Sequence, residues 1–201
     1  MTHAIDLSRW IERVGDSKKQ DLMLRVAGWI GCSRSGPWLV GGSVRRFVTG
    51  AAQDSDFDIG CLNDAQHEQL STRLLELCAE RVKSTDFYDE WKLPREDGDT
   101  IKVQVLKHVR GDAAAILDSF DFTLCQCAFD GESLIFGDFA LWDIGRRKMA
   151  IHKVSFAVST VRRLLKYAKQ GYSMCDGCAK TLLNAVLDDP STINSEVEYV
   201  D

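Results

Sequence analysis

Short apolar runs separated by turn-forming residues recur through the first three quarters of the chain, which is the pattern of β-strands in a mixed fold. Gly41-Gly42 ends the first run, and Asp130-Gly131 separates the last two as a hairpin turn. A further turn is expected over residues 96–99. The strands predicted from these runs are residues 38–40, 56–61, 86–91, 101–106, 122–129 and 134–136.

Between the apolar runs, hydrophobic residues recur with the helical period, and beyond residue 150 this is the main pattern. One or two helices are expected within residues 6–30. The other predicted helices are residues 43–49, 65–83, 113–117, 153–170 and 179–187. This order predicts an α+β fold, with a mixed α and β domain over residues 1–150 and a helical extension over residues 151–201.

The composition is that of a globular protein with a sizeable core, because 45% of the 201 residues are hydrophobic and only three are proline. No apolar run approaches the roughly 18–20 residues that a membrane-spanning helix needs. The amino-terminal residues carry charges where a signal peptide would be apolar. We therefore expect a cytoplasmic protein without a membrane partner.

Charge is distributed unevenly along the chain. The formal net charge of −5 does not favour a dedicated nucleic-acid binder, and the segment from Asp188 to Asp201 is acidic. Basic residues crowd one segment: Arg146, Arg147, Lys148, Lys153, Arg162, Arg163, Lys166 and Lys169. This segment is consistent with a phosphate-binding face and equally with a solvated helix face.

Seven cysteines in a chain without a secretory signal do not favour a disulfide framework. Cys125 and Cys127, together with the Cys175-Asp-Gly-Cys178 pair, would supply four thiolates for zinc if the fold brought them together. The alternative is that Cys125 and Cys127 fill the buried face of a strand, while the CxxC pair lies in a turn or at a helix start.

Asp56 and Asp58 are the strongest candidates for catalysis. They are spaced i, i+2 in a predicted strand, so both side chains point to one face. Two carboxylates on one face can hold a divalent cation such as Mg²⁺ (or Mn²⁺), which prefers oxygen ligands and shares them with phosphate groups. The alternative is an exposed edge strand with solvated acids.

About a dozen residues earlier, a glycine turn leads directly into a helix. The backbone N–H groups of Gly41, Gly42 and Ser43, with the positive end of the helix dipole, form a natural seat for phosphate. The alternative is a plain strand-to-helix turn. Arg45 would offset phosphate charge with its forked guanidinium, or would form a structural ion pair with Asp54 or Asp56.

These motifs resemble a known family. Gly41-Gly42-x-Val44-Arg45, then Gly50, then Asp56-x-Asp58 resembles the head of the polymerase-β-like nucleotidyltransferases, in particular bacterial tRNA CCA-adding enzymes and poly(A) polymerases, with their GGxVRD and DxD signatures. The stretch from Asp121-Phe-Thr-Leu to Asp130-Gly131 is similar to the family's RRDFTINALAYD motif. More weakly, residues 163–172 resemble the helix that begins the family's neck.

The resemblance implies a nucleotidyltransferase head followed by a short helical neck. It implies transfer of a nucleoside monophosphate from an NTP, ATP or CTP, to a hydroxyl acceptor such as tRNA-like RNA, with release of pyrophosphate. Asp56 and Asp58 would be the catalytic metal ligands, and Asp121 would bind the nucleotide's ribose unless it only caps a turn. The implied nucleotide-binding residues are Gly41, Gly42, Ser43, Arg45, Arg46, Asp121 and Arg163.

The chain also departs from the family's pattern. Arg46 replaces the aspartate that follows the motif arginine, and Cys125 replaces the asparagine of the second motif. The family's base-reading Glu-Asp-x-x-Arg element would fall near residues 156–160, which read FAVST. The position of the wider superfamily's third carboxylate is taken by Gln104, which cannot act as a base.

These departures leave three interpretations open. Two carboxylates suffice, or Asp99 or Asp121 contributes a third, or activity is weak or lost. The alternative function is therefore a non-catalytic module, or a nucleotidyltransferase directed at a protein or small molecule. An example with a protein partner would be one half of a toxin–antitoxin or defence pair.

Overall fold

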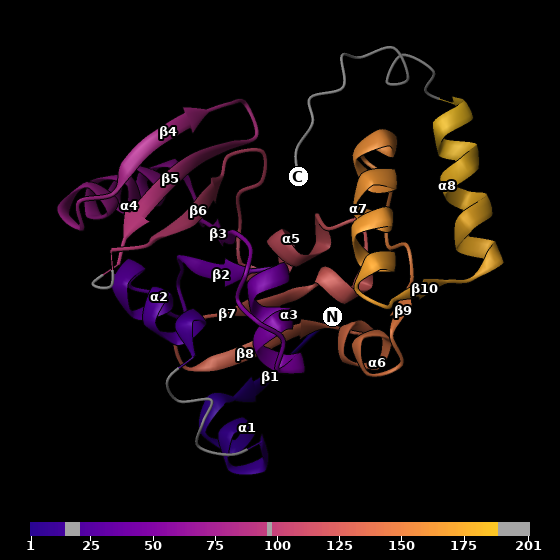
Figure 1. Cartoon of the computed structure of the whole chain (residues 1–201), viewed down its shortest axis with the longest axis horizontal. Helices are drawn as coiled ribbons and strands as arrows, with labels where there is room; N and C mark the ends of the chain where they lie inside the picture. The colour runs from indigo at the N-terminus through magenta and orange to yellow at the C-terminus, as the bar shows by residue number, and fades with distance from the viewer. Residues whose placement is uncertain (15–20, 96–97, 189–201) are drawn as a thin grey trace.

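The computed structural model describes residues 1–14, 21–95 and 98–188, and its centre is one mixed sheet (Figure 1). The strand order in this sheet is β1-β8-β7-β2-β3-β6-β5-β4. The strands are β1 (Thr2–Asp6), β2 (Trp38–Val40), β3 (Phe57–Gly60), β4 (Glu80–Ser84), β5 (Tyr88–Pro94), β6 (Thr100–Leu106), β7 (Cys127–Phe129) and β8 (Ser133–Gly137). Residues 96–97 of the expected turn, and residues 189–201 of the acidic segment, lie outside the described residues.

The central strand β3 pairs antiparallel with β2 and parallel with β6, and the other neighbours in this sheet are antiparallel. The register sets Asp58 opposite Val40 on one side and opposite Gln104 on the other. The carboxylate motif therefore lies in the middle of the sheet, and the alternative of an exposed edge strand is wrong.

Helices surround the sheet, and a small parallel pair, β9 (Lys148–Met149) and β10 (Ser173–Met174), lies apart from it. The helices are α1 (Leu7–Val14), α2 (Leu22–Ile30), α3 (Gly42–Thr49), α4 (Asp64–Glu76), α5 (Ala113–Asp118), α6 (Ala140–Gly145), α7 (Ala157–Lys169) and α8 (Asp176–Asp188), with the 3₁₀ helix η2 (Thr123–Cys125). Helices α7 and α8 lie side by side at one end of the molecule, and β4, β5 and β6 lie toward the other (Figure 1). No helix among the described residues is long and apolar enough to span a membrane.

One hydrophobic core runs through both parts of the chain. It includes Phe47 of α3 and Phe57 of β3, and it also includes Phe122, Tyr167 of α7 and Tyr172. Because burying aromatic rings contributes strongly to stability, α7 is packed as part of the same core as the sheet. The division into a head (1–150) and a helical extension (151–201) stays a prediction.

The structure corrects three of the sequence-based elements. The helix predicted over residues 65–83 ends at Glu76, and β4 begins at Glu80, because Cys78 adopts a left-handed backbone (φ 58°) and the following residues pair with β5. Within the predicted strand over residues 122–129, residues 123–125 form η2 and only β7 is extended. The alternation of the first residues was not recognised as β1, which pairs with β8.

Candidate functional site

Most of the residues singled out by the sequence line one cleft of about 700 Å³ between the sheet and α7. Those in its lining are Gly41, Gly42, Arg45, Arg46, Asp56, Asp58, Asp121 and Arg163, together with Gln104. Ser43 is not part of the lining: its side chain is fully buried, and its hydroxyl donates to the Val40 carbonyl oxygen at 3.4 Å. Any contact of Ser43 with phosphate would therefore be through its backbone N–H.

The two carboxylates lie beside the glycine turn. A Cβ built on Gly41 would be 3.6 Å from Asp58 Oδ2. Ser55 Oγ donates to Asp56 Oδ1 at 2.6 Å. Burial by itself would raise the pKa of Asp56, but this hydrogen bond and the charge of Lys166 lower it overall. Asp56 is therefore stabilised as a carboxylate.

The Asp58 carboxylate has no hydrogen-bond or ion-pair partner in the described part of the chain. Burial raises the pKa of Asp58 to about 7, and the negative charge of Asp56 adds to this effect. Three cationic side chains oppose the shift: Lys166, Arg46 and Arg163. A divalent cation between the two carboxylates would remove both the like-charge repulsion and the lack of a partner, so the residues present fit such an ion.

No group of three or more His, Cys, Asp or Glu side chains suited to a metal occurs among the described residues. Gln104 Nε2 donates to Glu90 Oε2 at 3.3 Å, so the carboxylate that follows Asp58 and Gln104 across the sheet lies on β5. The side chain of Asp99 is 73% exposed and pairs with Arg95 at 3.8 Å in the connection between β5 and β6. The suggestion that Asp99 supplies a third ligand is therefore wrong.

The glycine turn has a backbone that only glycine adopts readily. Gly41 has φ 69° and ψ −127°, and its N–H donates to the Cys127 carbonyl oxygen at 2.7 Å. A Cβ at this position would also meet the ring of Phe120 at 3.4 Å. The two glycines therefore bring the amino-terminal end of α3 to the cleft without side chains of their own.

The Arg45 side chain connects α3 to the end of α7. Its guanidinium lies over the rings of Tyr167 (4.6 Å) and Tyr172 (5.4 Å) and donates to Gln170 Oε1 at 2.9 Å. The side chain is only 2% exposed. Neither of the aspartates considered as ion-pair partners, Asp54 and Asp56, is its partner.

Arg46 faces the glycine turn more directly than Arg45 does. Its Nη2 donates to the Asp56 carbonyl oxygen at 3.1 Å, and its Nε donates to Gln53 Oε1 at 3.2 Å. Its Nη1 lies 3.2 Å from where a Cβ on Gly42 would be. Arg46 therefore brings a positive charge to the side of the cleft that the glycine turn forms.

Asp121 is engaged by helix α7. Thr160 Oγ1 donates to Asp121 Oδ2 at 2.7 Å, and Arg163 forms an ion pair with the same oxygen. The Asp121 backbone carbonyl also accepts from the N–H groups of His152 and Lys153. Asp121 thus fixes α7 and Arg163 against the cleft wall.

Sequence reasoning named Lys166 in the basic segment without assigning it to the site, and it did not single out two aromatic residues of the cleft. Lys166 Nζ lies 3.5 Å from Ser55 Oγ, and it follows Arg163 by three residues, so helical spacing could have placed both on one face. Phe87 and Phe156, which are also in the lining, come from segments far apart in the sequence. No local signal connects those two rings.

The four cysteines proposed for zinc are not assembled. Cys125 and Cys127 are buried, and the Cys125 thiol donates to the hydroxyl oxygen of Tyr167 at 3.0 Å. Cys175 is exposed at the start of α8, with Cys178 in its first turn. The alternative interpretation is confirmed for Cys175 and Cys178, while Cys125 lies in η2 and only Cys127 in a strand.

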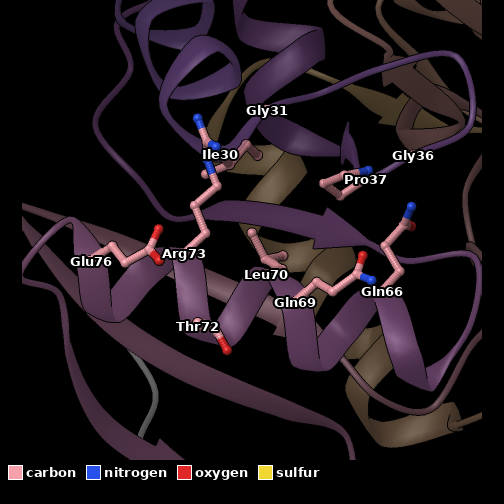
Figure 2. A pocket seen from close by; sticks show the side chains of 10 residues that line it. All are labelled: Ile30, Gly31, Gly36, Pro37, Gln66, Gln69, Leu70, Thr72, Arg73 and Glu76. Atoms are coloured by element: carbon pink, nitrogen blue, oxygen red, sulfur yellow. The ribbon is translucent and has the colours of Figure 1, made fainter.

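A second hollow of about 500 Å³ lies between the end of α2 and α4 (Figure 2). Gln66 and Arg73 extend from α4 toward it, where they donate to the carbonyl oxygens of Ser35 and Trp29. Their side chains hold the loop after α2 in place. None of the residues singled out from the sequence lines this hollow.

The model of one protein family, described as Gabija anti-defense 2 family protein, matches residues 6–147, well over half of the chain. The chain belongs to the Gabija anti-defense 2 family. The matched segment of this Gabija anti-defense 2 chain includes the glycine turn, both carboxylates and Asp121, and it ends before α7. Comparison with curated proteins gave no match.

Solved structures similar to this Gabija anti-defense 2 chain are CCA-adding enzymes. The Thermotoga maritima CCA-adding enzyme complexed with tRNA has a TM-score of 0.62 and 20% identity, covering 94% of this chain and 47% of that chain. A CCA-adding enzyme with CTP has a TM-score of 0.60 and 19% identity, covering 94% and 46% respectively. The chain thus spans about half the length of these proteins, and its polymerase-β-like nucleotidyltransferase fold is confirmed.

Proposed function

We propose that the protein is a metal-dependent nucleotidyltransferase, which moves a nucleoside monophosphate from an NTP to a hydroxyl acceptor and releases pyrophosphate. The observation that carries this proposal is that Asp58, which has no hydrogen-bond or ion-pair partner among the described residues, lies in one cleft with Asp56 and the glycine turn before α3. A nucleoside triphosphate needs these groups close to one another: oxygen ligands for its cation, and N–H groups for its phosphates.

Asp56 and Asp58 would hold Mg²⁺ (or Mn²⁺). The ion would supply charge stabilisation at the α-phosphate and a lower pKa for the attacking hydroxyl. Gly42 and the first turn of α3 would bind the β- and γ-phosphates, with Arg46 offsetting their charge. Asp121 would keep Arg163 directed at the nucleotide.

The proposed acceptor is RNA, and the proposed nucleotide is ATP or CTP. The solved structures with this fold include a complex with tRNA and complexes with ATP and CTP, which supports both proposals by analogy. The cations of α7 at the cleft, Arg163 and Lys166, would attract a polyanionic acceptor. Because of the family to which the chain belongs, we propose that the modification counteracts Gabija defence.

The enzymatic part is tested by incubating the purified protein with Mg²⁺, each labelled NTP, and RNA or protein acceptors. Label should be transferred by the wild type and by Asp54→Asn, because Asp54 is exposed and outside the cleft. Transfer should fall at least about 100-fold in Asp56→Asn or Asp58→Asn, since each loses a metal-ligating charge. Equal transfer by all four proteins would contradict the proposal.

A second candidate is a nucleotide-binding module without turnover, and two contacts favour it. Gln104 stands in register with Asp58 where a third carboxylate would complete the site, and Asp121 is occupied by Thr160 and Arg163. This candidate predicts Mg²⁺-dependent NTP binding without labelling of any acceptor. In cells that carry Gabija, it also predicts that Asp58→Asn reduces anti-defence activity only as far as it reduces NTP binding.

A further inference from the structure

Three aromatic rings meet at the mouth of the cleft. The ring of Phe87 contacts that of Phe156 edge to face, with centroids 5.3 Å apart, and lies 5.9 Å from the ring of His108. His108 Nδ1 is also 3.0 Å from the Phe87 carbonyl oxygen, which fixes the imidazole beside the phenylalanine. All three residues line the cleft that contains Asp56 and Asp58.

Phe87 and Phe156 are far more exposed than the phenylalanines of the hydrophobic core. Each is 45% exposed, whereas the rings of the core, such as Phe47 and Phe57, are at most 1% exposed. A pair that served only to fill the interior would be covered on all sides. Both residues belong to the lining of the cleft, where a flat apolar ligand would cover exposed ring surface.

The groups that face the cleft from α7 follow an order that suits a nucleotide. Lys166, next to Ser55 and the carboxylates, lies near one end of the helix, and Arg163 with its partner Asp121 comes next. Phe156, the residue that caps the amino terminus, lies at the other end. At about 1.5 Å per residue, Phe156 is roughly 15 Å along the axis from Lys166. Phosphate, ribose and base would meet cation, ion pair and aromatic ring in that order.

The first turn of α7 carries no carboxylate, amide or guanidinium that would read the hydrogen-bonding edge of a base. Residues 156–160 read FAVST, and of their two hydroxyl groups only that of Ser159 belongs to a residue in the cleft lining. The Thr160 hydroxyl is fully buried and donates to Asp121 and to the Phe156 carbonyl oxygen. Aromatic stacking therefore remains as the strongest interaction that this segment provides for a base.

We propose that Phe87 and Phe156 form a stacking platform for the nucleobase of the bound nucleotide. Because every base has a π-face, the platform holds purines and pyrimidines alike, and the site does not select the base by its edge. Selectivity is confined to stacking strength, with purines bound somewhat more tightly. This inference rests on the proposed function, because it takes the nucleotide's phosphates to lie at the glycine turn.

Isothermal titration calorimetry in Mg²⁺ tests the platform, with ATP, GTP, CTP, UTP and inorganic tripolyphosphate as separate ligands. The four NTPs should bind the wild type with dissociation constants within about 10-fold of one another. Phe156→Ala should weaken every NTP by about 5- to 100-fold and leave tripolyphosphate unchanged, because only the base loses a partner. Phe87→Ala should also weaken the binding of every NTP. Phe156→Trp should bind the NTPs about as tightly as the wild type, because tryptophan keeps an aromatic face at this position.

Phe139→Ala is the matched control, because Phe139 is 64% exposed and lies outside the cleft. The platform is wrong if one NTP binds more than 100-fold more tightly than the rest, or if Phe156→Ala and Phe87→Ala bind NTPs like the wild type. If tripolyphosphate binds in that second case, the phosphate and metal site stands without the platform. A wild type that binds neither NTP nor tripolyphosphate contradicts both proposals.

Discussion

At the scale of single residues, the site is built from groups that are unfavourable in the free protein. The Asp58 carboxylate lies beside Asp56 and has no partner within the part of the chain that the structure describes, and Gly41 has a backbone conformation that other residues do not readily adopt. Such features cost stability unless a ligand or the surrounding structure compensates for them. Substitutions at these residues should therefore have different effects on the stability of the free protein and on its ability to bind a ligand.

Asp58→Asn should stabilise the metal-free protein at pH 8 and should have a smaller effect at pH 5, which lies part of the way through the titration. The pKa of Asp58 is about 7 in the fold, against 3.8 ordinarily. The folded state therefore retains a proton that the unfolded state loses, and the contribution of Asp58 to stability falls as the pH rises from about 4 through 7. Asparagine resembles the protonated form at every pH.

Because the cleft is open to solvent, we expect roughly 1–2 kcal/mol, or a Tm higher by about 3–6 °C, at pH 8. Thermal unfolding of both proteins at the two pH values, in the presence of a chelator, measures the difference. The exposed Asp54→Asn serves as the control. A change in Tm that is the same at pH 5 and pH 8 would show that the Asp58 charge is not the cause.

Gly41→Ala should destabilise the protein by about 1–3 kcal/mol, because alanine does not readily adopt φ 69° with ψ −127°. Its Cβ would also press on the Phe120 ring. Gly28→Ala is the contrasting variant, since Gly28 lies within α2 with nothing within 4 Å of the added Cβ. That variant should gain about 0.5–1 kcal/mol. Urea denaturation of the three proteins compares their free energies of unfolding.

At the scale of elements, the cleft depends on how α3 and α7 are held together. Arg45 extends from α3 to a position over Tyr167, in α7, and over Tyr172, just beyond it. From the opposite direction, Arg163 and Thr160 of α7 bind Asp121, which precedes η2. Two separate contacts thus fix the helix that carries the cations and the stacking ring.

Arg45→Lys should lower the free energy of unfolding by about 1–3 kcal/mol although it keeps the charge. The ammonium group lacks the planar face that lies over Tyr167 and Tyr172, and it would have to keep the bond to Gln170 from a buried position. Arg162→Lys, on the exposed face of α7, is the control and should change the free energy of unfolding by less than about 0.5 kcal/mol. Guanidinium denaturation measures the free energy of unfolding of both variants. Equal values for the two would contradict the role of Arg45 in holding α3 against α7.

At the scale of the whole molecule, the cleft lies between the sheet and α7, and one hydrophobic core is shared by both. A ligand in the cleft would therefore stabilise both parts of the chain together. The net charge of −5 opposes a polyanionic ligand at long range, whereas Arg46, Arg163 and Lys166 favour it locally.

Mg²⁺ with ATP should raise the Tm of the wild type in a single transition. At 100 times the dissociation constant, the stabilisation is about 2.7 kcal/mol, or roughly 5–10 °C. Circular dichroism and tryptophan fluorescence should report the same midpoint, since Trp91 of the sheet and Tyr167 of α7 belong to the shared core. The shift should vanish in Asp56→Asn, and two separate midpoints in the wild type would contradict a common unfolding unit.

The sequence predicted the fold, and most of the residues that it singled out line one cleft, but it did not predict their contacts. The motifs from Gly41 to Asp58 and around Asp121 indicated a nucleotidyltransferase head, and the fold is confirmed. The sequence pattern gave the wrong element where strand pairing determines the secondary structure. Residues 80–83 were predicted to be helical, but they lie in a strand because this segment pairs with β5. The tertiary contact overrides a helical pattern in that segment.

What the sequence by itself determined is local: a turn that requires Gly41, and two carboxylates on one face because their spacing is i, i+2. The tertiary structure decided what surrounds them. It placed Gln104 between Asp58 and Glu90, set Arg45 against two tyrosines, and paired Phe87 with Phe156. These partners are separated by up to about 130 positions, and only strand register and helix packing bring them together, whereas spacing within one strand or turn is fixed by backbone geometry.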